Sequence, residues 1–352
     1  MRVVFNKLNS VNNPNSIHGI YPYRGKISSK EASSIVSQLP KGSTLLDPFS
    51  GSGTIVYEGL INGLNVIGID NNPLAYWLAK GKIGSLEKNK TDYIEEASSY
   101  IEQAKDVTLE TSKYPELLSK HFHEKSAHEI LRLKMFYEDM SDYLKAVFLG
   151  AVALTARGCN DYKWTSSTVG KDINPKRYIP FFEKFLYKVK KHYKNYPIET
   201  KHTLVLGDTR KLTTYLPEKS VDFVFTSPPY FNCLDYTAYY GKIIYDLFGQ
   251  NRSEIRGSLI QNVKDYEDDM RTSLTEIVKV TKDDGLIIFV VGDKKISGTI
   301  INGGEYFSNL LHHEPNQILE REYTNSSSQV FDKLNNTKRK EQIVIWDKST
   351  WN

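Results

Sequence analysis

The sequence has few cysteines, little net charge and no long apolar run. Cys159 and Cys233 are the only cysteines in 352 residues, which excludes a disulfide framework and a cysteine-rich zinc site and is typical of a reducing cytoplasm. No apolar run approaches the roughly 20 residues that span a bilayer, and residues 1–6 lack the apolar core of a secretory signal. The net charge of +4 permits a polyanionic partner without requiring one. These features predict a cytoplasmic globular protein.

A glycine-containing turn follows the first apolar strand, residues 43–47. The next residues read Pro-Phe-Ser-Gly-Ser-Gly-Thr before a helical pattern begins. Gly51 and Gly53 allow positive φ and a close approach of the backbone to a ligand. The strand at residues 65–70 then ends in Asp70, which is placed to accept hydrogen bonds from two ribose hydroxyls.

Nicotinamide enzymes share this arrangement, so a Rossmann-type oxidoreductase is one alternative. The third glycine of the dinucleotide fingerprint is missing, which favours a different adenosine cofactor. A third strand over residues 203–208 is expected to end in Asp208, which could accept from an adenine amino group. The spacing of His121, His123 and His128 indicates no metal site.

A second turn interrupts the apolar strand at residues 221–225, where Thr-Ser-Pro-Pro-Tyr follows at residues 226–230. Two prolines cannot extend a central strand, so the chain leaves the sheet at the edge where ligands bind in open α/β sheets. The Ser227 hydroxyl and the Pro228 carbonyl are acceptors beside the aromatic face of Tyr230. This combination suits a planar heterocycle that carries an amino group.

Residues 226–230 resemble the catalytic motif of the amino-group DNA methyltransferases, in which Asp, Asn or Ser precedes Pro-Pro and an aromatic residue. The serine form is similar to that of the cytosine-N4-specific branch of the restriction-modification type. The glycine turn also resembles the methyltransferase form, and the resemblance extends to about Tyr245. It implies an α/β, Rossmann-like methyltransferase fold with a doubly wound, mostly parallel sheet, and S-adenosyl-L-methionine as the cofactor.

The resemblance also implies the residues of the site. Asp47 would lie near the methionine end of the cofactor, Asp70 would hold the ribose, and the segment from His18 to Lys26 would line the pocket, although a surface arm is the alternative for that segment. The implied cofactor-binding residues are Tyr23, Asp47, Phe49, Ser50, Gly51, Gly53, Thr54, Asp70, Asn71, Asp208 and Thr226. The implied catalytic residues are Ser227, Pro228, Pro229 and Tyr230.

The implied reaction is direct methyl transfer to the N4 amino group of a flipped cytosine in double-stranded DNA. Ser227 and the Pro228 carbonyl would accept from the amino group, and Tyr230 would stack on the base. Neither cysteine follows a proline, in agreement with a mechanism without a covalent base adduct. N6-adenine DNA methylation and RNA base methylation remain alternatives. A cognate restriction endonuclease is a possible partner.

Residues 85–200 break the strand–helix alternation and predict a mostly helical insertion between two parts of the core, residues 1–84 and 201–352. Residues 143–200 hold eleven Lys and Arg against four Asp and Glu, which suits phosphate contacts, with a solvated helix face as the alternative. The predicted DNA-binding residues are Lys163, Trp164, Lys171, Lys176, Arg177, Lys188, Lys190 and Lys191. The glycine motif precedes the catalytic motif, unlike the commonest cytosine-N4 order. The stretch after Tyr230 and residues 338–340 are therefore further candidates for target recognition.

Overall fold

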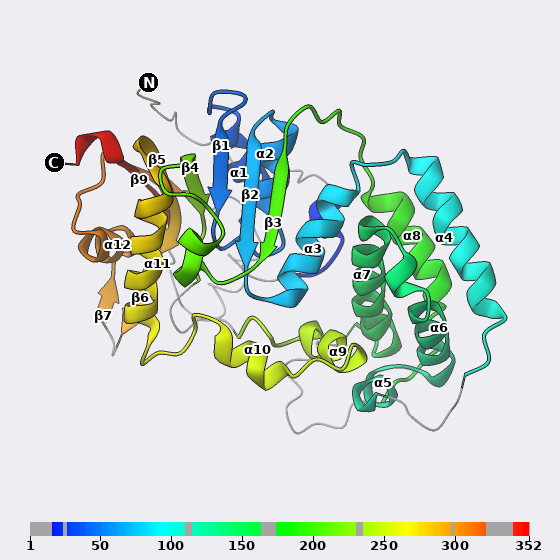
Figure 1. Ribbon diagram of the computed structural model, residues 1–352. Coiled ribbons are helices and arrows are strands. Elements are labelled where there is room, and N and C mark those ends of the chain that lie inside the picture. Colours follow the sequence, from blue (N-terminus) through cyan, green and yellow to red (C-terminus); the bar gives the residue numbers. More distant parts are fainter. Residues whose placement is uncertain are drawn as a thin grey trace.

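The protein is an α/β structure organised around one seven-stranded sheet (Figure 1). The computed structural model describes residues 16–23, 27–109, 115–162, 174–229, 235–296, 299–321 and 341–351. The strands of the sheet are β1 (Thr44–Asp47), β2 (Asn65–Asp70), β3 (His202–Leu206), β4 (Val221–Thr226), β5 (Thr281–Gly292), β8 (Gln317–Arg321) and β9 (Glu341–Asp347). A separate antiparallel pair is formed by β6 (Lys294–Ile296) and β7 (Thr299–Ile301).

The strands lie in the order β3-β2-β1-β4-β5-β9-β8. All pairs from β3 to β5 are parallel, and β9 is antiparallel to both of its neighbours. The direction of winding reverses between β1 and β4, and at such a switch point the connections diverge and leave a crevice at the carboxyl ends of the strands. The doubly wound, mostly parallel sheet predicted from the sequence is confirmed.

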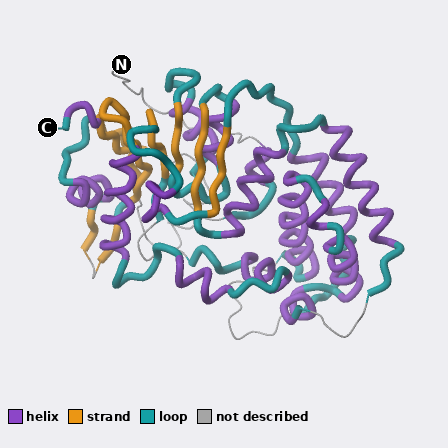
Figure 2. Tube along the Cα trace, viewed as in Figure 1, coloured by secondary structure: helices purple, strands orange, loops and turns teal. Residues whose placement is uncertain are grey.

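Helices cover both faces of the sheet (Figure 2). On one face lie α1 (Ser29–Val36), α2 (Thr54–Ile61) and α3 (Pro73–Gly84), and on the other lie α11 (Tyr266–Val280) and α12 (Gly303–Leu311). Because successive strand side chains point to opposite faces, Leu45 enters the core with α1 and α2, whereas Leu46 enters the core with α11 and α12. Strands buried on both faces read as continuous apolar runs, which is why the sequence revealed them.

A helical layer lies beside α3, at the β3 edge of the sheet (Figure 1). Its helices are α4 (Lys90–Lys105), α5 (Glu116–His121), α6 (Glu124–Lys134), α7 (Asp142–Cys159) and α8 (Phe181–His192). α7 packs on α3, where an added Cβ at Gly81 would lie 2.1 Å from the Ala146 Cβ. Two further helices, α9 (Tyr240–Leu247) and α10 (Arg252–Ser258), cross below the carboxyl ends of the strands (Figure 1).

Residues 16–23, here called the strap, connect this helical layer to the sheet. The strap begins as the 3₁₀ helix η1 (Ser16–Gly19) and packs against α8. Ile17, Ile20 and Tyr21 are buried within the same apolar cluster as α4, α7 and α8. The strap is therefore part of a packed core, and the surface-arm alternative is wrong for these residues.

Two local features differ from the sequence-based expectations. β3 ends at Leu206, and Asp208 instead caps the 3₁₀ helix η4 (Thr209–Thr214), where its carboxylate accepts from the Arg210 N–H at 2.9 Å. α1 was not anticipated. Among the described residues, no helix is both long and apolar enough to cross a membrane. Cys233 and the predicted basic link over residues 326–340 lie outside the described residues.

Candidate active site

The glycine turn after β1 is held in a tight conformation beneath α3. Gly51 and Gly53 have φ of 49° and 73°, and an added Cβ at Gly53 would lie 2.7 Å from the Ala79 Cβ. Both left-handed backbone geometry and close helix packing thus favour glycine here. The Lys82 ammonium, 1% exposed, lies beneath the turn and donates to the Ser52 hydroxyl at 3.1 Å.

Asp70 joins the glycine turn to the start of α3. Its carboxylate accepts from the Gly51 N–H at 2.8 Å and from the Asn72 N–H at 2.9 Å. Burial raises the pKa of Asp70 to about 6, against the opposing effect of these two hydrogen bonds. An ionised carboxylate has about four acceptor positions, so Asp70 keeps capacity for the two ribose hydroxyls that the sequence predicts.

Asp47 and Thr226 connect the glycine turn, which is predicted to bind the cofactor, to the turn after β4, which is predicted to be catalytic. The Thr226 hydroxyl donates to Asp47 Oδ1 at 2.6 Å, and both residues are buried. Burial raises the pKa of Asp47 to about 7, more than the hydrogen bonds from Thr226 and from the Phe49 N–H lower it. The two residues end the adjacent strands β1 and β4, so the hydrogen bond lies at the switch point of the sheet.

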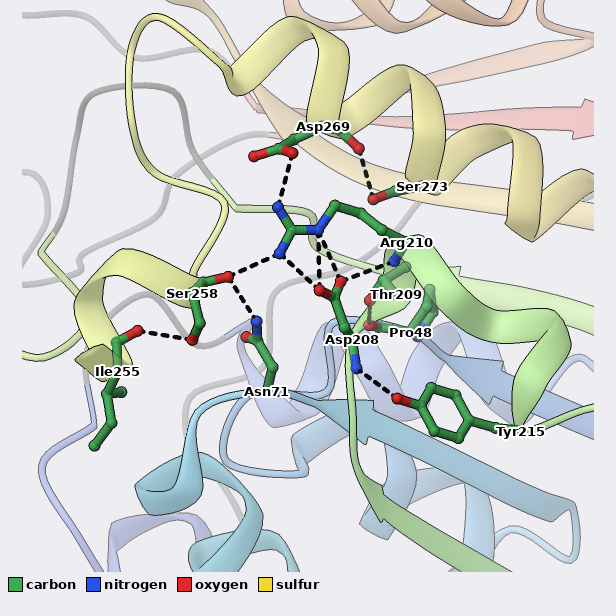
Figure 3. A network of polar contacts seen from close by, with 10 residues as sticks. All are labelled: Pro48, Asn71, Asp208, Thr209, Arg210, Tyr215, Ile255, Ser258, Asp269 and Ser273. Carbon is green, nitrogen blue, oxygen red and sulfur yellow. Dashed lines mark hydrogen bonds and ion pairs between the residues drawn. The ribbon is translucent and has the colours of Figure 1, made fainter. Parts of the chain in front are cut away.

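A polar network around Arg210 connects Asp208 and Asn71 to α10 and α11 (Figure 3). The Arg210 guanidinium donates to both oxygens of Asp208 and to Asp269 Oδ1 on α11, at 2.6–3.0 Å. It also donates to the Ser258 carbonyl, which accepts a second hydrogen bond from the Asn71 side chain at 2.9 Å. Asn71 thus anchors the end of α10, a role that its place after Asp70 did not reveal.

Two adjoining cavities open at this edge of the sheet. The larger encloses about 620 Å³ of empty space and the smaller about 300 Å³, each counted together with the open solvent at its mouth. Tyr23, Phe49, Gly51 and Ser227 line both. The larger adds Pro48, Asp70, Asn71, Asn72, Asp208, Thr209, Pro229, Tyr236, Leu259 and Ile260, and the smaller adds Ile27, Asp47, Ser50, Ser52, Thr54 and Ile55.

The residues around these cavities fit the predicted cofactor. Asn72 Nδ2 and Thr54 Oγ1 are buried and have no hydrogen-bond partner among the described residues. Thr54 begins α2, and a helix start is a ready site for a carboxylate. Burial raises the pKa of Tyr23 well above its usual value, and the Asp70 charge raises it further, so this tyrosine keeps a proton that it can donate. Asn72 was missed from the sequence although it follows Asp70 and Asn71 and caps α3 before Pro73, whereas nothing local marks the apolar pair Leu259 and Ile260.

The turn that is predicted to be catalytic follows β4 directly and lines the cavities. Ser227 lines both of them, and Pro228 is buried. The Pro229 carbonyl accepts from the Tyr266 hydroxyl of α11 at 2.7 Å, so it is already occupied and the Pro228 carbonyl remains the candidate second acceptor. Tyr230 lies outside the described residues. Among the described residues, no cluster of three or more His, Cys, Asp or Glu could hold a metal ion.

The predicted DNA-binding residues separate into groups. Lys176 and Arg177 are exposed beside the end of α7, which lies in the helical layer on the same side of the molecule as the carboxyl ends of the parallel strands (Figure 1). Lys190 and Lys191 are exposed near the C-terminal end of α8. From there the chain returns to β3 on the side of the molecule where the amino ends of the parallel strands lie (Figure 1). Lys163, Trp164 and Lys171 lie outside the described residues.

The prediction for Lys188 is wrong. Its side chain is only 6% exposed, and its ammonium donates to the Ile20 carbonyl of the strap at 2.8 Å. A phosphate cannot reach an ammonium that is enclosed between α8 and the strap. The count of basic residues on α8 did not distinguish this inward-facing lysine from the outward-facing ones.

An exposed aromatic residue follows α7 and was not among the predicted DNA-binding residues. Tyr162 is 57% exposed, and the Arg157 and Arg177 guanidiniums each lie 5.7 Å from its ring centre. Asp161 and Tyr162 both have positive φ, 52° and 61°, which is rare for a bulky residue and costs free energy. We call Arg157, Tyr162, Lys176 and Arg177 the Tyr162 cluster.

Comparisons with known proteins point to one family. A family model described as D12 class N6 adenine-specific DNA methyltransferase matches residues 28–284. The type II methyltransferase M.MjaII of Methanocaldococcus jannaschii is 22% identical over 83% of this chain and 75% of its own length. The type II methyltransferase M.BsoBI of Geobacillus stearothermophilus is 25% identical over 65% of this chain and 52% of its own length. The type II methyltransferase M.MvaI of Kocuria varians is 47% identical over 14% of this chain and 11% of its own length. The chain thus spans only about half of the second protein and a tenth of the third.

Solved structures show weaker similarity. An rRNA methyltransferase, aviRa from Streptomyces viridochromogenes, gives a TM-score of 0.38 at 13% identity and covers 93% of this chain and 88% of its own. A TehB-like SAM-dependent methyltransferase from Corynebacterium glutamicum gives a TM-score of 0.34 at 11% identity, and the alignment covers 91% of this chain and 89% of that protein. No functional conclusion follows at these TM-scores.

Replacing Asp70 tests the cofactor site. We expect Asp70→Ala to weaken S-adenosylmethionine binding by about 1.5–3 kcal/mol, because charged, buried hydrogen bonds are lost. Asp70→Asn keeps one acceptor and should lose less. Isothermal calorimetry measures both affinities, and a thermal melt verifies that each variant is folded. An unchanged affinity in folded Asp70→Ala would remove this residue from the site.

The raised pKa of Asp47 predicts a pH-dependent stability. Between pH 4 and 7 the folded state keeps a proton that the unfolded state has lost, so this carboxyl makes unfolding easier as the pH rises. Asp47→Asn has no such proton. Relative to the parent protein, its unfolding free energy should therefore rise between pH 4.5 and 7.5, by on the order of 3 kcal/mol. Denaturant titrations across this range measure the difference, and a constant difference would mean that Asp47 is ionised throughout.

Proposed function

The chain belongs to the family described as D12 class N6 adenine-specific DNA methyltransferases, and we propose that it is a site-specific type II DNA methyltransferase that modifies a base amino group. Membership of this family confirms S-adenosylmethionine as the cofactor and sets aside the oxidoreductase alternative. Two of the relatives named above are type II methyltransferases aligned over most of this chain or about two thirds of it, which supports action on DNA. A cytoplasmic location and a cognate restriction endonuclease are part of the proposal.

The observation that carries the proposal is Ser227 at the junction of the two cavities. One cavity is bounded by Asp70 and Asp208 and the other by Asp47 and Thr54, so Ser227 lies between the proposed adenosine and methionine ends of the cofactor. S-adenosylmethionine supplies an electrophilic methyl group on a sulfonium. A base amino group held at Ser227 would therefore face the carbon that it must attack.

The chain's own contribution is to position and polarise the amino group. Its nitrogen is a poor nucleophile because its lone pair is delocalised into the ring. The Ser227 hydroxyl and the Pro228 carbonyl would each accept an N–H hydrogen bond, which favours a pyramidal nitrogen with a free lone pair. Bound S-adenosylmethionine would supply the methyl group, with the electron pair of the broken S–C bond staying on its sulfur, and the methylated nitrogen would then release one proton to water. Positioning and electrostatics supply most of the catalysis.

We propose cytosine N4 as the target, on the serine at the first position of the motif. The second candidate is adenine N6, which the description of the matching family favours. Both bases present an amino group beside a ring acceptor. A serine hydroxyl can accept from the amino group and donate to the ring acceptor of either base. The two targets therefore differ in the fit of the base and not in the chemistry at Ser227.

Product analysis decides between these targets. We expect N4-methylcytosine when modified duplex DNA is digested to nucleosides and examined by mass spectrometry. Ser227→Ala should lower turnover by one to three powers of ten, on the order of one lost hydrogen bond in a preorganised site, with cofactor affinity retained. If N6-methyladenine were the sole product, the target would be adenine N6 and not cytosine N4. Methylation of RNA but not of DNA would contradict the substrate class.

We propose that the Tyr162 cluster contacts DNA. Its ring is exposed and can stack on a base, and its three cations can pair with phosphates. The end of α7 also contacts α5, because the Asn160 amide donates to the His121 carbonyl at 2.8 Å, and α5 packs on α9, the helix that follows the catalytic turn. Strain in two consecutive residues is typical of functional positions.

Salt dependence separates the two basic groups. Replacing Lys176 and Arg177 by Ala should weaken DNA binding and lower the slope of log affinity against log salt by about one for each lost phosphate contact. Tyr162→Ala should weaken binding by about 1–3 kcal/mol without changing the slope. Fluorescence anisotropy at several salt concentrations gives both quantities. If instead the Lys190 and Lys191 pair carries the slope, DNA runs along α8 and the Tyr162 cluster is not the contact.

A further inference from the structure

Three helices hold the strap from different sides. On α8, the Lys188 ammonium donates to the Ile20 carbonyl at 2.8 Å and lies 3.4 Å from the Gly19 carbonyl. One turn later, His192 Nδ1 lies 2.6 Å from the Ser16 carbonyl oxygen. Both side chains are at least 94% buried, so these contacts are shielded from water and are stronger than the same contacts at a surface.

Two further helices, α2 and α7, also contact the strap. Glu58 Oε1 on α2 lies 2.8 Å from His18 Nε2, with both side chains buried. On α7, an added Cβ at Gly150 would lie 1.8 Å from the Ile20 carbonyl oxygen. The Ile20 carbonyl is thus enclosed between the backbone of α7 and the ammonium of Lys188, and it has little freedom to move.

The end of the strap lies in the cofactor cavities. Tyr23, three residues after Ile20, lines both of them. Its ring lies beside the glycine turn, since an added Cβ at Gly51 would be 3.6 Å from Tyr23 Cε1. The backbone folds tightly just before it, where the Tyr23 N–H donates to the Tyr21 carbonyl at 2.8 Å. With so short a connection, the position of Ile20 determines the position of Tyr23.

A lysine at this place requires an explanation beyond packing. Burying an ammonium costs free energy unless its donors find acceptors, and a methionine would fill similar space without that cost. The ammonium gains hydrogen bonds to strap carbonyls that an apolar side chain could not make, and its loss would leave buried carbonyls poorly satisfied. The interaction therefore fixes the backbone of the strap.

We propose that Lys188 of the helical layer is a positioning residue for the cofactor: it fixes the strap so that Tyr23 forms a wall of the S-adenosylmethionine pocket. This inference rests on the proposed function of that pocket. It assigns Lys188 to cofactor binding in place of the DNA contact that the composition of α8 suggests.

Cofactor titration tests the proposal without DNA. Lys188→Met should weaken S-adenosylmethionine binding about tenfold by calorimetry. In the methylation assay, KM for the cofactor should rise by a similar factor, while kcat at saturating cofactor stays within about twofold. Lys184→Met, on the same helix one turn earlier, is the matched control and should bind as the parent does. Equal affinities of the parent and folded Lys188→Met would overturn the proposal.

A double-mutant cycle with Tyr23→Ala separates positioning from general destabilisation. If Lys188 acts through Tyr23, the double variant should bind no more weakly than Tyr23→Ala alone. Additive losses would overturn the proposal. Should Lys188→Met fail to fold, His192→Gln releases the start of the strap and enters the same cycle with the same expected outcome. A parent protein that binds no S-adenosylmethionine would contradict the proposed function itself, which keeps the two failures distinct.

Discussion

The hydrogen bond from Thr226 to Asp47 joins the two halves of the site. It links the end of β1, where the cofactor turn begins, to the end of β4, where the catalytic turn begins, at a donor–acceptor distance of 2.6 Å in a buried environment. Because β1 and β4 are adjacent and parallel, both turns leave the sheet at the same edge. In the proposed site, the distance between a bound cofactor and Ser227 would therefore be set by sheet geometry, as positional catalysis requires.

The parts of this arrangement that were readable from the sequence are local. β1, β2, β4 and β5 are continuous apolar runs, and the glycine turn and the Pro-Pro turn each carry their own backbone constraints. The nearness of Asp70 to the glycine turn follows from the pairing of β1 with β2, whereas its hydrogen bonds with the Gly51 and Asn72 N–H groups were not predicted. By contrast, Leu259 and Ile260 reach the cavity through packing between elements far apart in the chain, and no local pattern marks them.

The error at Lys188 shows where composition misleads. Counting charges on α8 treats every lysine as solvated. Phe181, Phe185, Lys188 and His192 follow one another at steps of four, three and four residues, which is the buried stripe of an amphipathic helix. The pattern therefore contained a signal that Lys188 faces inward. What it could not contain is the identity of the partner, because the strap carbonyls lie more than 160 residues away in the sequence.

The position of the helical layer in the chain has a consequence for folding. β2 pairs with β3 across all of residues 71–201, whereas β1 reaches β2 through a short connection. If that long segment were a flexible chain, closing it would cost about 2 kcal/mol more than closing the short one. The helices between the two strands pack in one apolar cluster with the strap, α3 and α9, so much of this segment must be in place before its two ends are held close together. β3, and with it the Asp208 wall of the pocket, should therefore be the last part of this edge to assemble.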